Sequence, residues 1–336
     1  MEHSQSDGAA LRAWTPQMLP ALEHVMFYDL REEVSGEIEA ALSWVHEHGL
    51  DLSSVEPEDV RLPSFSRDVP ILRRRLDDGL GFVVVRGVPV DLSRPDIDIV
   101  YWAMCNYLAR VMRQRIGGPS IDTLRDEGGD PDPFRLSRTN RYFDVHTDNG
   151  GLEPRMPDYL GLLCVRSARR GGESIIAGSH RVHEVLESEY PEHLPVLASE
   201  FEAVKLNVQS HGGRETLRYP VLRKQGEEVV LRYNRPYIEA GMTFVGTPLD
   251  PTQRAALDRL DEVLHRPDVR YQYKLRPGEI LFNNNRYTLH GRTAYEDWPD
   301  AERQRELKRA WMWRRHIGPG WDPVELDRAE LYPDLP

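Results

Sequence analysis

The sequence contains little cysteine. Its 336 residues include only two, Cys105 and Cys164, and each lies in an apolar stretch. Two isolated cysteines do not make a disulfide framework, so we expect free thiols in a reducing compartment. Both are interpreted as core residues, because an unpaired cysteine behaves as a small apolar side chain.

Long apolar runs are also missing. No stretch approaches the roughly 20 apolar residues that cross a bilayer, and residues 1–14 lack the basic and then apolar pattern of a secretory signal. We therefore expect a cytoplasmic protein without a membrane partner. No GxGxxG or GxxxxGK[ST] sequence is present, so nothing indicates a dinucleotide or P-loop site.

Basic residues are outnumbered. Asp and Glu number 55 against 43 Lys and Arg, which gives a formal net charge of −12. A general attraction to nucleic acid or to anionic membranes is therefore not expected. Local basic patches could still bind small anions, and assembly into homo-oligomers stays open. The 40% hydrophobic and 29% charged residues are typical of a folded globular protein.

Hydrophobic periodicity predicts helices early in the chain and mostly short strands further along it. Helical spacing appears at 36–48 and 95–112, and the β-branched run 81–87 between them predicts a buried strand. Many short strands with turn residues between them follow, and these favour a β-sandwich or barrel over alternating βαβ units. The later predicted strands are 142–147, 159–167, 173–177, 228–233, 269–275, 279–283 and 308–314, with helical insertions at 180–189 and 252–265.

The range 116–136 breaks this pattern. It holds four glycines and three prolines at positions 117, 118, 119, 128, 129, 131 and 133, so we expect no regular element there. A long loop just before a motif is often a lid over a binding site, and the alternative is a plain connector.

The chemistry of the sequence centres on His146-Thr147-Asp148. Residues two apart on a strand point to the same face, so His146 and Asp148 can reach one metal ion together. His290, far downstream, is the candidate third ligand. Two imidazoles and one carboxylate on one face of an octahedron leave the opposite face open, as in non-haem Fe(II) oxygenases.

Two arginines follow His290. Arg305 and Arg309 are four residues apart, and both come before the apolar run 310–313, which begins a strand. A planar guanidinium suits a carboxylate, so they fit a pocket for the distal carboxylate of 2-oxoglutarate. The alternative is a pair of solvated charges on a turn.

Five pieces of the sequence together resemble the TauD/TfdA family of 2-oxoglutarate dioxygenases, in the clavaminate-synthase-like group. They occur in the family's order and at its spacing, over about 81–314. The pieces are Gly81–Gly87, His146-Thr147-Asp148, Gly171-Gly172-Glu173-Ser174, Asn285-Arg286 through His290-Gly291-Arg292-Thr293-Ala294, and Arg305-xxx-Arg309.

This resemblance implies a mainly β fold, a distorted double-stranded β-helix or jelly roll, with flanking helices. It implies one catalytic domain over 1–336, with a jelly-roll core at about 81–314. It also implies Fe(II) held by His146, Asp148 and His290, with 2-oxoglutarate and O2 as cosubstrates. Ser174 and Arg305 match residues that contact 2-oxoglutarate, and Arg309 matches a second arginine lining the site.

On this pattern the expected reaction is hydroxylation of an unactivated C–H bond, with release of succinate and CO2. Desaturation, epoxidation and ring formation remain open, whereas chlorination is disfavoured because Asp148 is present. The surrounding polar residues suggest a small polar substrate, amino-acid-like or bearing a carboxylate; the alternative is that they satisfy loop backbone. The candidate substrate residues are Asn140, Tyr142, Asn149, Asn284 and Arg292.

Two further pairs of histidines are interpreted as structural. His180 and His183 are three apart on a predicted helix, and His46 and His48 lie near a helix end. Two competing functions are retained: a jelly-roll enzyme that uses its metal for non-redox chemistry, and a non-catalytic ligand-binding relative.

Overall fold

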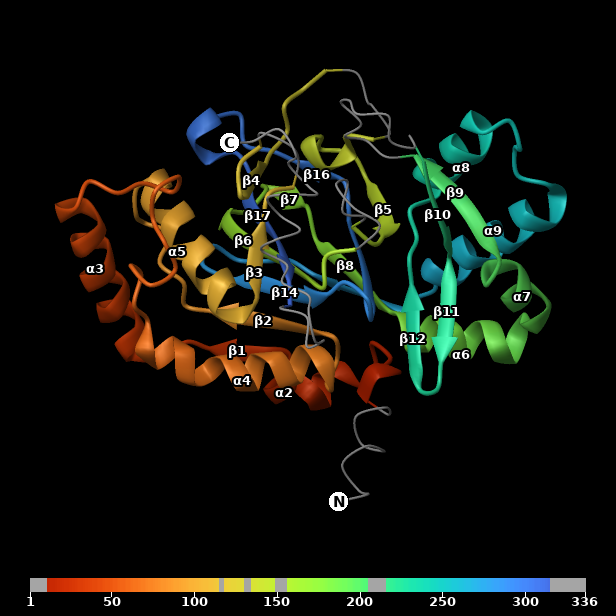
Figure 1. The fold of residues 1–336 in the computed structure, drawn as a ribbon, viewed down its shortest axis with the longest axis horizontal. Coiled ribbons are helices and arrows are strands. Elements are labelled where there is room, and N and C mark those ends of the chain that lie inside the picture. Colours follow the sequence, from red (N-terminus) through yellow and green to blue (C-terminus); the bar gives the residue numbers. More distant parts are fainter. Residues whose placement is uncertain (1–10, 115–117, 130–133, 149–155, 205–215, 315–336) are drawn as a thin grey trace, which may run out of the picture.

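The computed structural model describes residues 11–114, 118–129, 134–148, 156–204 and 216–314. The fold is β-rich with helices on both flanks, as Figure 1 shows. None of the described helices is long and apolar enough to cross a membrane.

The larger sheet has seven strands. Its order is β1-β2-β14-β6-β17-β3, and β4 also pairs with β17. Only the β1–β2 pair is parallel; the other pairs are antiparallel. The strands are β1 (Phe27–Asp29), β2 (Phe82–Arg86), β14 (Ile280–Asn284), β6 (Tyr159–Arg166), β17 (Glu306–Trp313), β3 (Arg110–Met112) and β4 (Ile121–Leu124).

The second sheet has four antiparallel strands in the order β13-β8-β15-β5. They are β13 (Arg270–Tyr273), β8 (Ser174–Gly178), β15 (Thr288–Arg292) and β5 (Phe143–His146). The described residues also form three two-stranded pairs: β9 (Glu200–Val204) with β10 (Thr216–Pro220), β11 (Leu222–Gln225) with β12 (Glu228–Leu231), and β7 (Arg170–Gly171) with β16 (Tyr295–Glu296).

Helices cover the outer faces of both sheets. In Figure 1 the helices α3 to α5 lie on one side and α6 to α9 on the other. The first group, with the short α2 (Glu23–Met26), contains α3 (Glu32–Glu47), α4 (Pro63–Asp77) and α5 (Arg94–Leu108). The second contains α6 (Ser179–Glu189), α7 (Leu194–Leu197), α8 (Arg235–Phe244) and α9 (Pro251–Leu264). Short 3-10 turns lie at Leu19–Leu22, Leu136–Arg138, Pro191–His193 and Ala301–Arg303.

Strand β2 shows how the layers are joined. Successive side chains of a strand point to opposite faces, so Val83 and Val85 pack into the core under α3 to α5, whereas Phe82 and Val84 join a core on the inner face. That inner core also contains Ile176 of β8. The two sheets therefore pack face to face, and residues pointing inward from either sheet share one interior.

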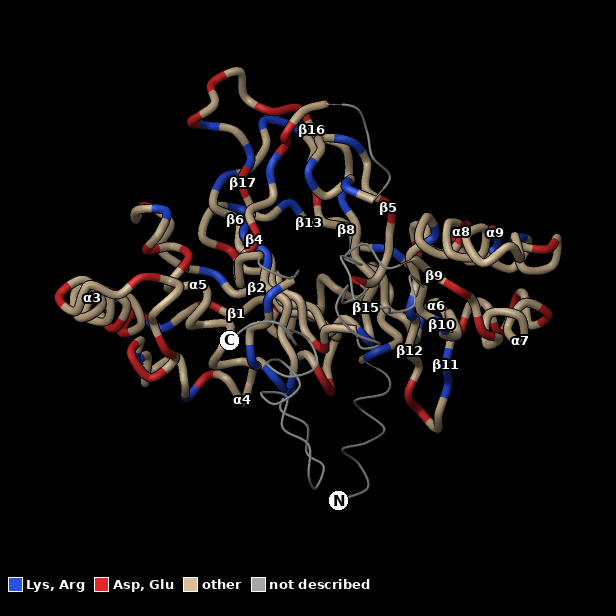
Figure 2. The backbone as a smooth tube through the Cα atoms, turned by 45° about the horizontal axis from the view of Figure 1, so that its top comes forward, with Lys and Arg blue, Asp and Glu red and all other residues tan. Residues whose placement is uncertain are grey.

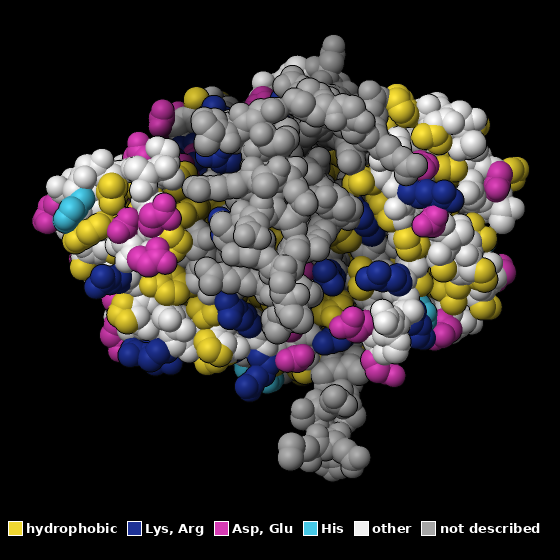
Figure 3. All heavy atoms as spheres, in the orientation of Figure 1, with side chains coloured by type: hydrophobic (Ala, Val, Ile, Leu, Met, Phe, Trp, Pro, Cys, Tyr) yellow, Lys and Arg dark blue, Asp and Glu magenta, His cyan; other side chains and the backbone are white. Residues whose placement is uncertain are grey.

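Charged positions are distributed unevenly along the backbone. Figure 2 shows Lys and Arg on the central strands, including β17, whereas Asp and Glu are frequent on the outer helices. On the face in Figure 3, acidic, basic and hydrophobic side chains are interspersed over both helical flanks.

Most predicted elements are confirmed. The buried strand at 81–87 is β2, the strands from 142 onward correspond to β5, β6, β8, β12, β13, β14 and β17, and the helical insertions are α6 and α9. The helix predicted at 36–48 is α3, which begins earlier, at Glu32. Helices α4 and α8 and strands β9 to β11 were not predicted.

Two predictions were wrong in part. The helix predicted at 95–112 ends at Leu108, because Ala109 is extended and Arg110–Met112 pairs with β17 instead. The range 116–136 is not wholly irregular, because Ile121–Leu124 forms β4 against β17 and buries Ile121 and Leu124. Residues 116, 117 and 130–133 lie outside the described residues, and the lid stays a prediction.

Candidate metal centre

The pairing of β5 with β15 brings the two predicted histidine ligands together. His146 lies directly opposite His290 in the register of these strands, which shifts immediately afterwards, between His290 and Arg292. The centroids of the two imidazole rings are 4.5 Å apart. Residues distant in the sequence therefore meet because of one antiparallel strand pair.

Asp148 follows the end of β5 and completes the group. Its Oδ1 lies 3.6 Å from His146 Nε2, and its Oδ2 lies 3.8 Å from His290 Nε2. One ligand atom from each of the three residues lies within 4.8 Å of the others, and the residues His146, Asp148 and His290 are 3%, 6% and 7% exposed. Among the described residues this is the one cluster of His, Cys, Asp and Glu with such geometry.

One hydrogen bond of the His146 ring leaves its other nitrogen available to a metal. Its Nδ1 lies 2.7 Å from the backbone oxygen of Asp144, which can only accept, so Nδ1 carries the proton. The other nitrogen, Nε2, is therefore a lone-pair donor, and it is buried without a hydrogen-bond partner. A buried polar atom left unpaired costs free energy, so this atom fits a ligand that a metal would satisfy.

The charge states also suit metal binding. Burial alone would raise the pKa of the Asp148 carboxyl, but Arg309, His146 and His290 together hold it below its usual range. Burial, with His146 and Arg309 nearby, lowers the pKa of His290 to about 3. At neutral pH the site therefore offers an ionised carboxylate and a neutral His290, the forms that bind metals. This donor set is that of non-haem Fe(II) oxygenases.

Two residues that were given no role from the sequence hold Asp148 in place. The side-chain oxygen of Asn285 accepts from Asp148 N at 3.0 Å, and its Nδ2 donates to Asp148 O at 2.8 Å. Trp311 Nε1 donates to Asp148 Oδ2 at 2.7 Å. Asn285 lies in the run that carried the family resemblance, whereas no sequence signal pointed to Trp311.

The Trp311 hydrogen bond can be tested by removing its donor alone. Trp311→Phe keeps an aromatic ring but loses the indole N–H, so we expect metal affinity to fall by about 10–100-fold. Equilibrium titration with Mn(II) measures this. Trp313→Phe, two residues along the same strand, is the matched control and should bind Mn(II) as the unchanged protein does; equal affinities for both variants would contradict this role.

Arg309 lies between the candidate metal centre and β4. Its Nη1 is 3.6 Å from Asp148 Oδ2, and its Nη2 is 3.4 Å from Asp122 Oδ2. Its Nε donates to Gln114 Oε1 at 2.8 Å. The predicted second arginine therefore borders the site, and its partners are the side chains of Asp148, Asp122 and Gln114.

Arg305 is a buried cation beside the same interior. It is 5% exposed, and no ion pair to it occurs among the described residues. Arg305 and Arg292 both lie near the Tyr295 ring, with their guanidinium carbons 5.0 and 4.9 Å from the ring centroid. Burial lowers the pKa of Arg305, and burial together with Arg305 lowers that of Arg292 to about 10. Ser174 is buried on β8 opposite Arg292.

The two glycines before Ser174 fit this region closely. Gly171 has φ +68°, and a Cβ there would lie 2.1 Å from Ala294 O. Gly172 has φ +75°, and a Cβ there would lie 3.3 Å from Arg305 Nε. Other residues rarely adopt such backbone angles, so both positions require glycine, and Gly172 leaves room for the Arg305 side chain.

The candidate substrate residues differ in their exposure and in their hydrogen-bond partners. Asn140 is exposed. Tyr142 is 37% exposed, and its hydroxyl lies 3.4 Å from Asp144 Oδ1 and 3.2 Å from Arg270 Nη1. Asn284 is fully buried and donates to Leu76 O and Asp77 Oδ1. Arg292 donates to the backbone oxygens of Arg141, Leu136 and Thr293. Asn149 lies outside the described residues.

The histidines interpreted as structural have protein partners. His180 Nε2 lies 3.1 Å from Glu227 O, and His183 is buried on the same helix, α6. His46 Nε2 lies 2.7 Å from Asp96 Oδ1, and the His48 ring stacks on Trp44.

Comparison with known proteins adds a family and several relatives. Residues 48–311 match the model of the taurine catabolism dioxygenase TauD, TfdA family. FR-33289 synthase of Streptomyces rubellomurinus is 25% identical over 292 residues, covering 85% of this chain and 84% of that protein. Uridine-5'-phosphate dioxygenase from a Streptomyces species is 30% identical over 198 residues, covering 57% and 68%.

Solved structures share the fold at lower identity. Asparagine oxygenase in complex with Fe(II), 2S,3S-3-hydroxyasparagine and succinate superimposes with a TM-score of 0.67 at 20% identity, covering 86% of this chain and 93% of that chain. The non-heme iron oxygenase OrfP in complex with Fe and alpha-ketoglutaric acid gives a TM-score of 0.64 at 20% identity, covering 85% and 93%.

Proposed function

The chain belongs to the taurine catabolism dioxygenase TauD, TfdA family, and we propose that it is an Fe(II)- and 2-oxoglutarate-dependent oxygenase whose metal is held by His146, Asp148 and His290. The observation that carries this assignment is the convergence of two imidazoles and one ionised carboxylate, all buried, within 4.8 Å. The unpaired Nε2 of His146 supports it, because a buried lone pair needs a partner.

Bound Fe(II) supplies the oxidative decarboxylation of 2-oxoglutarate by O2 to succinate and CO2, coupled to hydroxylation of a substrate C–H bond. The residues of this chain bind and orient the reactants. Arg305 pairs with the distal carboxylate of 2-oxoglutarate, with Ser174 beside it. Arg309 keeps Asp148 ionised through its charge. Because Asp148 occupies a metal position, hydroxylation is favoured over chlorination.

We further propose that the two packed sheets form a distorted double-stranded β-helix in a single catalytic domain over 1–336. The larger sheet and the sheet β13-β8-β15-β5 share the inner core, and each contributes residues to the candidate site. Asp148 follows β5 and His290 lies on β15, whereas Trp311 and Arg309 come from β17 of the larger sheet. The site therefore lies between the two sheets.

The proposed substrate is a small polar, amino-acid-like molecule. Support comes from the structural neighbours, one bound to 3-hydroxyasparagine and another bound to (3S)-hydroxy-L-Arg. In this chain Asn140 and Tyr142 are exposed just before β5, so they can meet a substrate directly. Asn284 and Arg292 already bond within the fold, so in this proposal they shape the pocket around the substrate.

The test measures succinate from 2-oxoglutarate with Fe(II) and O2, in the presence of each of the twenty amino acids in turn. We expect at least one amino acid to stimulate succinate formation and to gain one oxygen atom, as mass spectrometry detects. A protein that binds metal but binds no 2-oxoglutarate under anaerobic conditions would instead be a non-redox metal enzyme, and the proposal would be wrong.

A further inference from the structure

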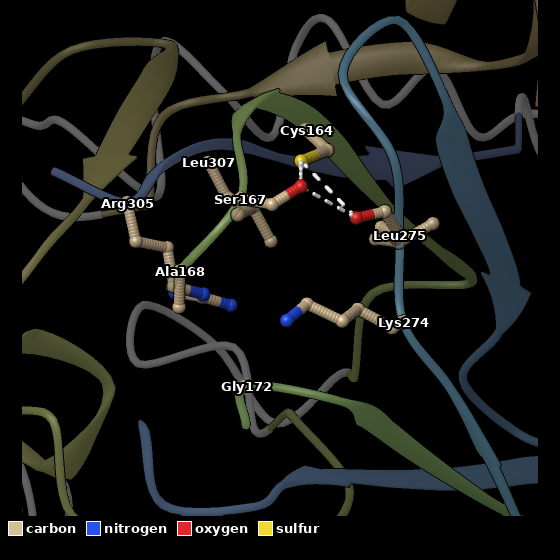
Figure 4. A pocket seen from close by; sticks show the side chains of 8 residues that line it. All are labelled: Cys164, Ser167, Ala168, Gly172, Lys274, Leu275, Arg305 and Leu307. Carbon is tan, nitrogen blue, oxygen red and sulfur yellow. Dashed lines mark hydrogen bonds between the residues drawn. The ribbon is translucent and has the colours of Figure 1, made fainter. Parts of the chain in front are cut away.

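A small cavity lies beside Arg305, at the end of the interior between the sheets. Cys164, Ser167, Ala168, Gly172, Lys274, Leu275, Arg305 and Leu307 line it (Figure 4). Its free volume is about 10 Å³, which is the space of one water-sized group. The cavity can therefore receive the end of a ligand, such as part of a carboxylate, but not a whole cosubstrate.

Two cations point into this cavity. Figure 4 shows the Arg305 guanidinium and the Lys274 ammonium extending toward one another from opposite walls. They lie at the ends of two different strands: Arg305 comes directly before β17, and Lys274 comes directly after β13. Among the described residues neither forms an ion pair. Like charges facing each other are unfavourable, so an anion bound between them would stabilise both.

The lining itself supplies no such anion. Burial raises the pKa of the Cys164 thiol to about 11, so it is neutral at pH 7; the charge of Glu279 acts in the same direction, whereas the Ser167 hydroxyl, Arg305 and Lys274 act to lower the pKa. The Ser167 hydroxyl is uncharged and donates to Leu275 O at 3.0 Å. Asp297 accepts from the Arg305 backbone nitrogen at 2.7 Å, and its charge acts to raise the pKa of Arg305, which burial lowers, but it does not line the cavity. A ligand carboxylate can supply the anion that the lining lacks.

We propose that Lys274 is a second cosubstrate-binding residue, which with Arg305 clamps the distal carboxylate of 2-oxoglutarate. This inference rests on the proposed function and specifies one end of its cosubstrate site. The guanidinium offers a planar pair of donors, and the ammonium offers a point charge from the opposite side. One carboxylate placed between them neutralises two facing cations, and its end fits the small free volume.

The experiment measures the dissociation constant of 2-oxoglutarate for the Mn(II)-loaded protein by calorimetry, so that no turnover is involved. Lys274→Met removes the charge and keeps much of the apolar stem, and we expect the constant to rise about tenfold. Lys274→Arg should stay within about threefold of the unchanged protein, because the charge is kept. Lys224→Met, at a half-exposed lysine outside this cavity, is the matched control and should have no effect.

A second ligand separates loss of charge from damage to the fold. The five-carbon acid 2-oxopentanoate keeps the metal-chelating end of 2-oxoglutarate but lacks its distal carboxylate. Its dissociation constant should be the same for Lys274→Met and the unchanged protein. Equal weakening of both ligands in Lys274→Met would overturn the inference, because the effect would not depend on the distal carboxylate.

The remaining outcomes distinguish the inference from the function on which it rests. If Lys274→Met binds 2-oxoglutarate normally while Arg305→Met does not, the inference is wrong and the proposed function stands. If the unchanged protein loaded with Mn(II) binds no 2-oxoglutarate, the proposed function itself is wrong, and the inference fails with it.

Discussion

Replacing His290 by alanine should abolish both metal binding and succinate formation. The substitution removes one of three donors from a buried site, and the two that remain, His146 and Asp148, cannot enclose the ion. Removing a group that merely orients a ligand costs about 10–100-fold in metal affinity, so removing the ligand itself should cost at least about a hundredfold. Competition with a chelator measures the Fe(II) affinity, and succinate is measured in the same samples.

The control for this variant is another buried histidine. His183 is 5% exposed on α6 and is not part of the triad. His183→Ala should retain metal and succinate formation, provided that circular dichroism shows both variants to be folded. A folded His290→Ala protein with unchanged Fe(II) affinity would remove His290 from the metal centre.

Replacing Arg305 by methionine should raise the dissociation constant of 2-oxoglutarate by about 30-fold or more. Truncating one partner of a buried charge pair costs roughly 2–5 kcal/mol, because the other charge is left unpaired. Arg305 has no ion-pair partner among the described residues, so the ligand-free protein loses no salt bridge in this variant. We therefore expect thermal stability without 2-oxoglutarate to be equal or higher, since a buried unpaired cation is destabilising.

Arg303 provides a matched control two residues earlier in the chain. It is exposed, and its guanidinium lies over the Trp298 ring at 3.8 Å from the centroid. Arg303→Met should leave the affinity for 2-oxoglutarate unchanged. Normal 2-oxoglutarate affinity in Arg305→Met, together with unchanged folding, would show that the distal carboxylate binds elsewhere.

The three proposed metal ligands were predictable because their evidence is local in the sequence or carried by a motif. His146 and Asp148 are two apart at a strand end, which places both side chains on one face. His290 was found through the surrounding run and its resemblance, since nothing local shows that β15 pairs with β5. The structure supplies the missing step, with His290 directly opposite His146.

The residues that support the ligands could not be predicted from the sequence, because their contacts depend on the register of the strands. Trp311 is 163 positions from Asp148, yet its indole donates to the carboxylate. Lys274 and Arg305 face each other only because the ends of β13 and β17 meet at one cavity. A one-residue shift in either strand would turn these side chains to the opposite face, and single-sequence patterns do not fix register that finely.

Arg292 illustrates a different limit. It was a candidate substrate residue because it flanks His290, and its guanidinium donates to the backbone oxygens of Arg141 and Leu136, so the substrate contact stays a prediction. An arginine fork matches a backbone carbonyl as well as a ligand carboxylate, so residue type does not choose between them. Similarly, β4 was missed because glycines and prolines surround it, and its stability comes from pairing with β17.

The most direct measurement is an anaerobic crystal structure with Fe(II) and 2-oxoglutarate. We predict one iron ion per chain, bound by His146, Asp148 and His290, with the distal carboxylate of 2-oxoglutarate on Arg305. Iron bound at other residues, or a distal carboxylate directed away from Arg305, would contradict the account.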